Sequence, residues 1–186
     1  MGGPRKIHSK VSRPRHPWRL DRITEENKLL QEYGLKAKRE IWRVQSQLKT
    51  FTNQAKKLIA ATGAQAVLEK SQLLGRLARL GLVSQSAGLD DVLGLSITDF
   101  LNRRLQTLVS KKGLAKNPKQ ARQFVTHEHI IVGTKKITSP GYLVPVAEEQ
   151  HISFVSNSSL ANPDHPERAV KQSAPVKQKP EAEVAA

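Results

Sequence analysis

The feature of the sequence that most restricts its fold is the stretch from Phe100 to Val146, where two short helical patterns precede runs of β-branched residues. Apolar residues at spacings of three and four predict a first helix that starts near Ile97, because this spacing places them on one face. Ser96 and Asp99 form an acidic version of a capping box, and Gly113 supplies the residue type that ends helices. The predicted apolar stripe consists of Phe100, Leu101, Leu105, Leu108 and Val109.

A second helix and a hairpin are predicted to follow. Asn117, Pro118 and Gln120 supply an N-cap, a first-turn proline and a capping partner. The residues 130–132 and Ile137 flank a Gly-containing turn, which is typical of a β-hairpin. We call this helix–helix–hairpin domain, residues 100–155, the compact unit. The apolar face of the second helix is Ala121, Phe124 and Val125.

Positive charge dominates the same stretch. Nine lysines or arginines between Phe100 and Lys136 are opposed by one acid, Glu128. The whole chain of 186 residues carries a formal net charge of +15, which argues against a neutral-surface enzyme and favours a polyanionic partner. An anionic membrane surface would also suit this charge. The predicted start of the second helix should add exposed backbone N–H groups, which attract anions. The nine cations are Arg103, Arg104, Lys111, Lys112, Lys116, Lys119, Arg122, Lys135 and Lys136.

Four regions are predicted along the chain. They are a basic extended arm over 1–22, a helical domain over 23–99, the helix–helix–hairpin domain over 100–155, and an extended or disordered tail over 156–186. The arm carries Trp18, which is available for stacking or for docking on the body of the protein.

The helical domain contains the longest regular pattern in the chain. Its apolar seam repeats at spacings of three and four, and its other side is basic. Lys38, Arg39 and Arg43 on that side are candidate phosphate contacts, and a merely solvated basic helix is the alternative. The seam consists of Ile41, Val44, Leu48, Phe51, Ala55 and Leu58.

A search for catalytic chemistry finds no nucleophile elbow, phosphate loop, dinucleotide fingerprint or zinc-protease motif. The chain has no cysteine, and His127, His129 and His151 lack further ligands to complete a metal site. No catalytic residue, metal or cofactor is therefore predicted. No apolar run approaches the length of a membrane span and no secretion signal is visible, so a membrane location is not expected.

Physical chemistry alone leaves the type of nucleic acid open. Two helices and a basic hairpin also match a winged helix that binds DNA. An RNA-recognition motif (RRM) is excluded, because its strands carry an aromatic platform for bases and aromatic residues are only 4% of this chain. Structured RNA is favoured, since the basic residues are spread over the arm, the long helix and the compact unit.

The sequence also resembles a known family. RRLQTLVSKKGLAK, QAR, HIIV and PGYLV, in that order, resemble the RNA-binding domain named after ribosomal protein "S four". HPWRLDRI, EYGLKAKREIWRV, LLGRLARLGLV and LDDVLGL resemble the archaeal and eukaryotic cytosolic branch of the S-four ribosomal protein family. The resemblance covers roughly residues 15 to 155. It also implies that the first part of the tail packs back along the helical portion, no further than about Arg168.

This resemblance implies an α+β fold, with a helical N-terminal portion and an inserted helix–helix–hairpin domain. It implies a structural protein of the small ribosomal subunit that binds 16S-type ribosomal RNA at a multi-helix junction early in assembly and influences translational accuracy. The implied neighbours are other small-subunit proteins, including "S five", in the cytoplasmic ribosome, with no homo-oligomer. A stand-alone RNA-binding factor that acts on ribosomal particles is the alternative. An RNA-modifying enzyme would need a catalytic domain that this chain cannot house.

The predicted RNA-binding residues come from the arm, the long helix and the compact unit. An Arg104→Glu substitution is expected to weaken RNA binding without unfolding the domain. The predicted residues are Arg13, Arg15, Lys38, Arg39, Arg43, Arg103, Arg104, Gln106, Thr107, Lys111, Lys112, Lys116, Lys119, Gln120, Arg122, Gln123, His127, Lys135 and Lys136.

Overall fold

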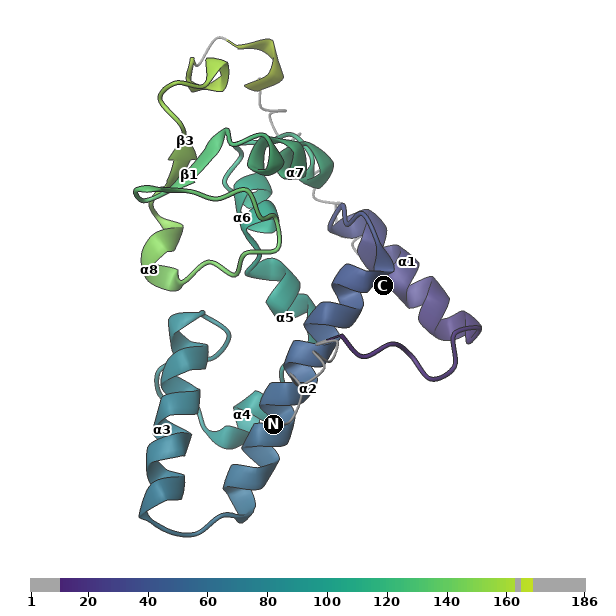
Figure 1. The fold of residues 1–186 in the computed structure, drawn as a ribbon, viewed down its shortest axis with the longest axis vertical. Coiled ribbons are helices and arrows are strands. Elements are labelled where there is room, and N and C mark those ends of the chain that lie inside the picture. Colours follow the sequence, from purple (N-terminus) through teal and green to yellow (C-terminus); the bar gives the residue numbers. More distant parts are fainter. Residues whose placement is uncertain (1–10, 163–164, 169–186) are drawn as a thin grey trace, which may run out of the picture.

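The computed structural model describes residues 11–162 and 165–168 as an α+β protein, which confirms the predicted fold class. Figure 1 shows two lobes: α6, α7 and the strands form the upper lobe, and the helical part forms the other. In the helical part, α2 runs from beside α1 at the right down to α3 at the bottom. The elements are α1 (Leu20–Glu32), α2 (Lys38–Ala60), α3 (Ala64–Arg79), α4 (Leu89–Leu93), α5 (Ile97–Asn102), α6 (Leu105–Lys111), α7 (Pro118–Thr126), β1 (Ile130–Val132), β2 (Lys135–Lys136), α8 (Val146–Glu149) and β3 (Ile152–Phe154). Short 3-10 turns follow at Ser159–Ala161 and Pro166–Arg168.

Helix α2 is the spine of the helical part. It contacts α1, α3, α4 and α5, and its predicted apolar seam lies in their shared core. Ile41, Val44, Phe51 and Ala55 are buried, which confirms the interpretation of the 3–4 spacing. Phe51 stacks on Phe100 of α5, with 6.0 Å between the ring centroids.

The compact unit packs α6 on α7 beside a three-stranded antiparallel sheet in the order β2-β1-β3. The predicted hairpin forms, and Val132 pairs with Lys135. Its turn is shorter than predicted, because the second strand is Lys135–Lys136 and ends before Ile137. A third strand, β3, joins the sheet, and Ile130 of β1 pairs with Phe154. The second core contains Leu105, Val109, Ala121, Val125, Ile130 and Val144.

The prediction of one continuous first helix in the compact unit is wrong. The structure divides this segment into α5 and α6, with a break at Arg103 and Arg104. The backbone N–H of Leu105 donates to the Tyr142 carbonyl at 2.8 Å, and Val144 N–H donates to the Arg103 carbonyl at 3.1 Å. These long-range bonds replace a helical turn, and the apolar spacing alone carries no sign of them. Phe100 and Leu101 therefore belong to the helical core, whereas Leu105 begins the second core.

The ends of the chain also differ from the expectation. Helix α1 begins at Leu20, inside the predicted arm. The first part of the tail packs on the compact unit and not along the helical portion, because Leu160 fills the second core. Arg168 lies over the Phe154 ring, 5.0 Å from its centroid. The predictions for 1–10 and 169–186 fall outside the described residues.

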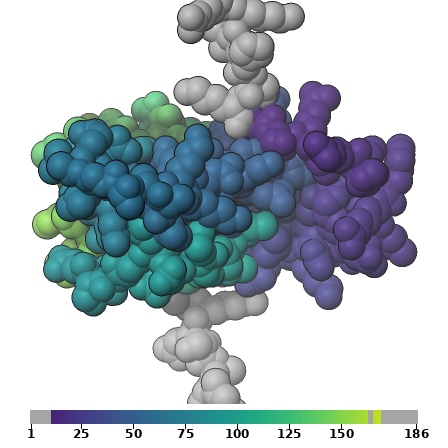
Figure 2. All heavy atoms as spheres, turned by 90° about the horizontal axis from the view of Figure 1, so that it is seen from below, coloured from purple at the N-terminus to yellow at the C-terminus, as the bar shows by residue number. Residues whose placement is uncertain are grey.

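Figure 2 shows the molecule from the end where α2 and α3 meet. The first described residues, in purple, lie on the right of this view, and residues of the compact unit, in teal and green, lie on the left. The two ends of the described chain thus border different parts of the protein.

Candidate nucleic-acid interface

Six lysines of the compact unit are exposed, and we call them the exposed lysine set. They lie at the end of α6, in the α6–α7 loop, at the start of α7 and on β2. Figure 1 shows these elements in one lobe. The set consists of Lys111, Lys112, Lys116, Lys119, Lys135 and Lys136.

None of these lysines forms an ion pair with a carboxylate in residues 11–162 and 165–168. Lys111 donates to the Asn102 side-chain oxygen at 3.0 Å, Lys116 donates to the Pro166 carbonyl at 3.0 Å, and Lys112 donates to the Glu149 carbonyl. These acceptors are uncharged, so the positive charges remain unneutralised by the protein. Lysines in this state suit a polyanion, because bound phosphates release condensed counterions.

The arginines of the same stretch are used inside the protein. Arg104 Nη2 donates to Glu40 Oε2 at 2.7 Å, and Arg122 Nη2 lies 3.0 Å from Glu40 Oε1. Arg103 pairs with Glu149 at 2.7 Å and also donates to the Val144 carbonyl. We call Glu40, Arg104 and Arg122 the arginine joint, because they connect α2 to the start of α6 and to α7.

The expectation that Arg104 lies on the RNA-facing surface is wrong. Arg104 is 5% exposed, and its guanidinium forms an ion pair with Glu40. An Arg104→Glu substitution would place a second carboxylate beside Glu40 in this partly buried position. The substitution should therefore destabilise the protein, contrary to the sequence-based expectation.

Glu40 carries the opposing charge of the joint. Burial alone would raise the pKa of its carboxyl, but hydrogen bonds from Arg122 and Arg104 outweigh burial and lower the pKa below its ordinary value. The ionised form is thus the stable partner for both guanidinium groups. Sequence reasoning missed Glu40, although it is the single acid between Lys36 and Arg43.

Gln106 is also internal, so its predicted place on the binding surface is wrong. It is 1% exposed, and its side-chain amide donates to the carbonyls of Tyr33, Gly34 and Pro118 at 2.9–3.1 Å. Thr107 is half-buried and donates to the Leu101 carbonyl at 2.7 Å. Both side chains satisfy backbone acceptors where segments meet.

The N-terminus of α7 is not open to solvent as the sequence suggested. A Cβ atom on Gly34 would lie 2.9 Å from Pro118 Cβ and 3.0 Å from the Lys119 backbone nitrogen. The turn between α1 and α2 therefore packs directly on this helix end. Gly34 has φ +58, so glycine meets both the conformation and the lack of space.

The remaining predicted residues of α7 border the tail. Gln120 accepts from the Lys116 backbone N–H at 2.7 Å and donates to Glu167 at 3.1 Å. Gln123 and His127 are exposed and line a hollow beside the 3-10 turns. These two remain available to a ligand, whereas Gln120 fixes the loop before α7.

The arm and α2 bring three predicted cations together. Arg13, Lys38 and Arg39 line one cavity under the arm, while Arg15 and Arg43 are exposed without lining it. Lys38 Nζ lies 3.6 Å from Glu26 Oε2. The arm and the long helix thus share one surface.

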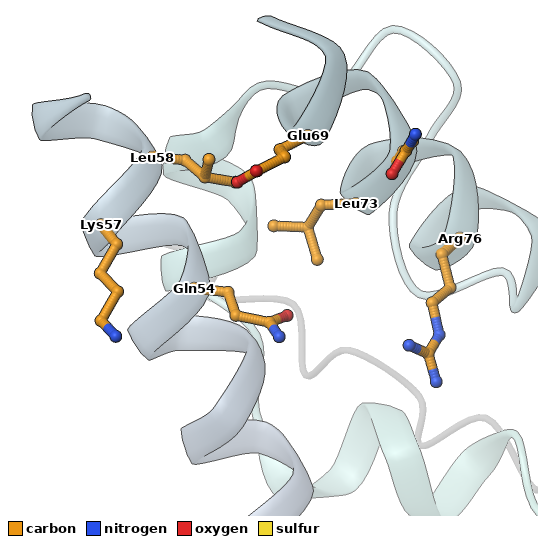
Figure 3. Close-up of a pocket in the computed structure, with 7 residues that line it drawn as sticks. Gln54, Lys57, Leu58, Glu69, Leu73 and Arg76 are labelled. Atoms are coloured by element: carbon orange, nitrogen blue, oxygen red, sulfur yellow. The ribbon is translucent and has the colours of Figure 1, made fainter. Parts of the chain in front are cut away.

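A second hollow lies between α2 and α3 and is shown in Figure 3. Its volume is about 340 Å³, and its lining combines Lys57 and Arg76 with one carboxylate, Glu69. Leu73 lies between the two helices in this view. The hollow therefore offers a mixed, open surface and no paired carboxylates for acid–base chemistry.

Within the described ranges, no group of three or more His, Asp or Glu side chains is placed to hold a metal ion. Nor does any helix among those residues have the length and apolar character to cross a membrane.

Residues 103–149 match the family model described as "S4 domain". Together with the helical part and the exposed lysine set, this match defines a basic α+β protein that carries an S4 domain.

The chain belongs to the uS4 family of small ribosomal subunit proteins. "Small ribosomal subunit protein uS4" of Methanococcus aeolicus is 52% identical over 169 residues, which cover 90% of this chain and 96% of that protein. The uS4 proteins of Methanococcus maripaludis and Thermoplasma volcanium are each 47% identical, over 93% and 98% of this chain. These relatives confirm the family resemblance drawn from the sequence.

Proposed function

We propose that the chain binds ribosomal RNA as a structural component of the small ribosomal subunit, with the exposed lysine set as its main phosphate-binding surface. The observation that carries this proposal is six exposed lysines without a carboxylate partner in the described part of an S4-domain protein. The family makes the chain a structural ribosomal protein and not an enzyme, and places it in the cytoplasmic ribosome.

The remaining predicted cations are proposed to extend this surface. Arg13, Arg15, Arg39 and Arg43 are exposed on the arm and α2, where they can reach RNA beyond the compact unit. Gln123 and His127 add polar groups at its edge. Contacts spread over two lobes suit a folded RNA junction, because one straight groove would engage only one lobe.

The test is a binding competition with the full chain. A small-subunit ribosomal RNA fragment and a DNA duplex of equal length compete at moderate salt. We expect the RNA to win, because its folded shape presents phosphates to both lobes. Equal or stronger binding to the duplex would contradict the proposal and favour the winged-helix alternative.

The finer assignments rest on the family resemblance. We propose binding at a multi-helix RNA junction, an early place in assembly, an influence on translational accuracy, contacts with other small-subunit proteins that include "S five", and no homo-oligomer. A footprint of the free protein on small-subunit RNA tests the first: protection of several helices around one junction supports it, and protection of one isolated helix contradicts it.

The alternative is a stand-alone factor that visits ribosomal particles. Cosedimentation with small subunits after a high-salt wash separates the two, because a structural component should remain bound. Release at moderate salt would favour the alternative.

A further inference from the structure

A cavity of about 650 Å³ lies between the arm, α1 and α2. Its size falls within the range of small-molecule sites. Both tryptophans of the chain line it, although they are separated by more than twenty residues in sequence. The residues that matter here are Arg13, Trp18, Glu26, Lys38, Arg39 and Trp42.

The aromatic groups offer a surface for stacking. Trp18 is 89% exposed, so it contributes little to the apolar core. Trp42 is half-buried, and its indole Nε1 donates to Glu26 Oε1 at 2.9 Å, which fixes the ring. Aromatic side chains at such positions bind unstacked nucleobases in proteins that contact single-stranded RNA.

Glu26 supplies an independent sign of a ligand. Its residue is 5% exposed, and Oε1 accepts from both Trp42 and Arg22. Oε2 is buried without a hydrogen bond from the described residues, and its ion-pair partner Lys38 lies at 3.6 Å. A buried carboxylate oxygen in this state calls for an N–H or O–H donor.

The charges around the cavity identify the kind of donor. Four cations line the cavity and disfavour a cationic ligand, whereas one carboxylate, Glu26, offers an acceptor to an N–H donor. The cations are Arg13, Arg22, Lys38 and Arg39. A nucleotide satisfies both conditions. Its base presents N–H donors, and its phosphate can reach the exposed side chains of Arg13 and Arg39. An amino group fits best. The N3–H of uracil lies between two carbonyl oxygens, which the carboxylate would repel.

We propose that this cavity binds one unpaired, amino-bearing base of RNA, stacked on the tryptophans, with its amino group donating to Glu26 Oε2. The inference rests on the proposed RNA-binding function and adds a base-recognition site to it. The exposed lysine set contacts phosphates, whereas this site reads a base edge. A base stacked on both Trp18 and Trp42 also orders the arm against α2.

The test uses the two tryptophans as reporters, since the full chain has no others. We expect AMP, GMP and CMP to quench tryptophan fluorescence in a saturable way, and UMP to bind at least several-fold more weakly. Trp18→Ala should weaken AMP binding by about fivefold or more, in line with a lost stacking contact. Leu20→Ala is the matched control, because Leu20 is 71% exposed on the same segment.

Two further measurements decide the identity of the ligand. Quenching by inorganic phosphate equal to that by AMP would overturn the proposal in favour of a simple anion site. Glu26→Gln should reduce the preference for AMP over UMP, with helicity checked by circular dichroism because Glu26 also pairs with Arg22 and Lys38. An unchanged preference in a folded variant would contradict the role of Oε2.

The same variants separate this proposal from the general function. Trp18→Ala should bind a small-subunit RNA fragment at least fivefold more weakly than Leu20→Ala. Equal binding by both variants, with binding still lost when the exposed lysines are removed, would overturn the base site and leave RNA binding intact. Loss of all RNA binding by the unmodified chain would instead defeat the proposed function. If Trp18→Ala lost only binding to another ribosomal protein, the occupant would be a protein and the base site would be wrong.

Discussion

The arginine joint and the exposed lysine set arise from one basic stretch, but the structure uses them in opposite ways. Arg104 and Arg122 converge on Glu40 at about 3 Å, whereas the six lysines have no carboxylate partner among the described residues. The planar guanidinium is suited to a shared carboxylate in a partly buried place, and the strongly hydrated ammonium is suited to solvent. Net charge therefore predicts the sign of the partner, but not which cations are free to meet it.

The joint should dominate stability. Glu40→Ala leaves two partly buried guanidinium groups without their counter-ion, and we expect a loss of about 3 kcal/mol in the free energy of unfolding. Urea unfolding followed by circular dichroism measures this change. Glu25→Ala on the exposed side of α1 is the control and should stay within about 0.5 kcal/mol of the unmodified protein. Equal effects of both substitutions would show that the joint adds nothing special.

Close packing beside the joint should have an effect of similar size. Gly34→Ala should cost about 2–4 kcal/mol, because it combines a left-handed backbone with a clash against α7. Gly113→Ala has a similar φ of +72 but nothing within 4 Å of the added Cβ, so it should cost about 1–2 kcal/mol. The difference between their unfolding midpoints isolates the packing contribution. Identical losses would mean that the turn does not press on α7.

The joint should also respond to pH. Since the folded pKa of Glu40 lies below its ordinary 4.5, its stabilisation is present above about pH 4.5 and is lost as pH falls through the folded pKa. Glu40→Gln lacks this titration. The gap in unfolding free energy between the unmodified protein and Glu40→Gln should therefore be constant near neutral pH and narrow below about pH 4.5. A gap that widened with acidification would contradict the assigned role of Glu40.

A single lysine should have the smallest effect, and only on binding. Lys135→Ala is expected to reduce the salt dependence of RNA binding by roughly 0.7–0.9 in log–log slope, with the unfolding free energy changed by less than about 0.5 kcal/mol. Lys70→Ala on α3, outside the residues that match the S4 domain, is the control. The prediction is wrong if Lys70→Ala changes the slope as much as Lys135→Ala does.

Local patterns in the sequence predicted much of the fold. The seam of α2, the acidic capping box at Ser96 and the hairpin all depend on residues close in sequence. The capping box forms as expected, with Ser96 N–H donating to Asp99 at 2.8 Å. Periods and caps are local properties, so one sequence is enough to identify them.

Long-range contacts set the limits of the prediction. The break between α5 and α6 depends on hydrogen bonds from a segment about forty residues away, and the burial of Gln106 depends on the turn at Gly34. The pairing of Glu40 with Arg104 and Arg122 spans 64 and 82 residues in sequence. No local pattern reveals which of nine cations will meet one distant acid. The sequence therefore predicts the positive charge of this stretch, but not which of its cations stay exposed and which form ion pairs inside the protein.

The central claim is that the exposed lysine set binds RNA while Arg104 and Arg122 of the arginine joint hold the fold together. It is tested most directly by measuring two quantities, the salt dependence of small-subunit RNA binding and the free energy of unfolding. One variant is the triple substitution Lys111→Ala, Lys112→Ala and Lys116→Ala, and the other is Arg122→Gln. The account predicts that the triple variant lowers the slope by roughly 2–3 at unchanged unfolding free energy, and that Arg122→Gln lowers the unfolding free energy at unchanged slope. The reverse pattern, with the slope lost on removal of Arg122 and retained without the three lysines, would contradict it.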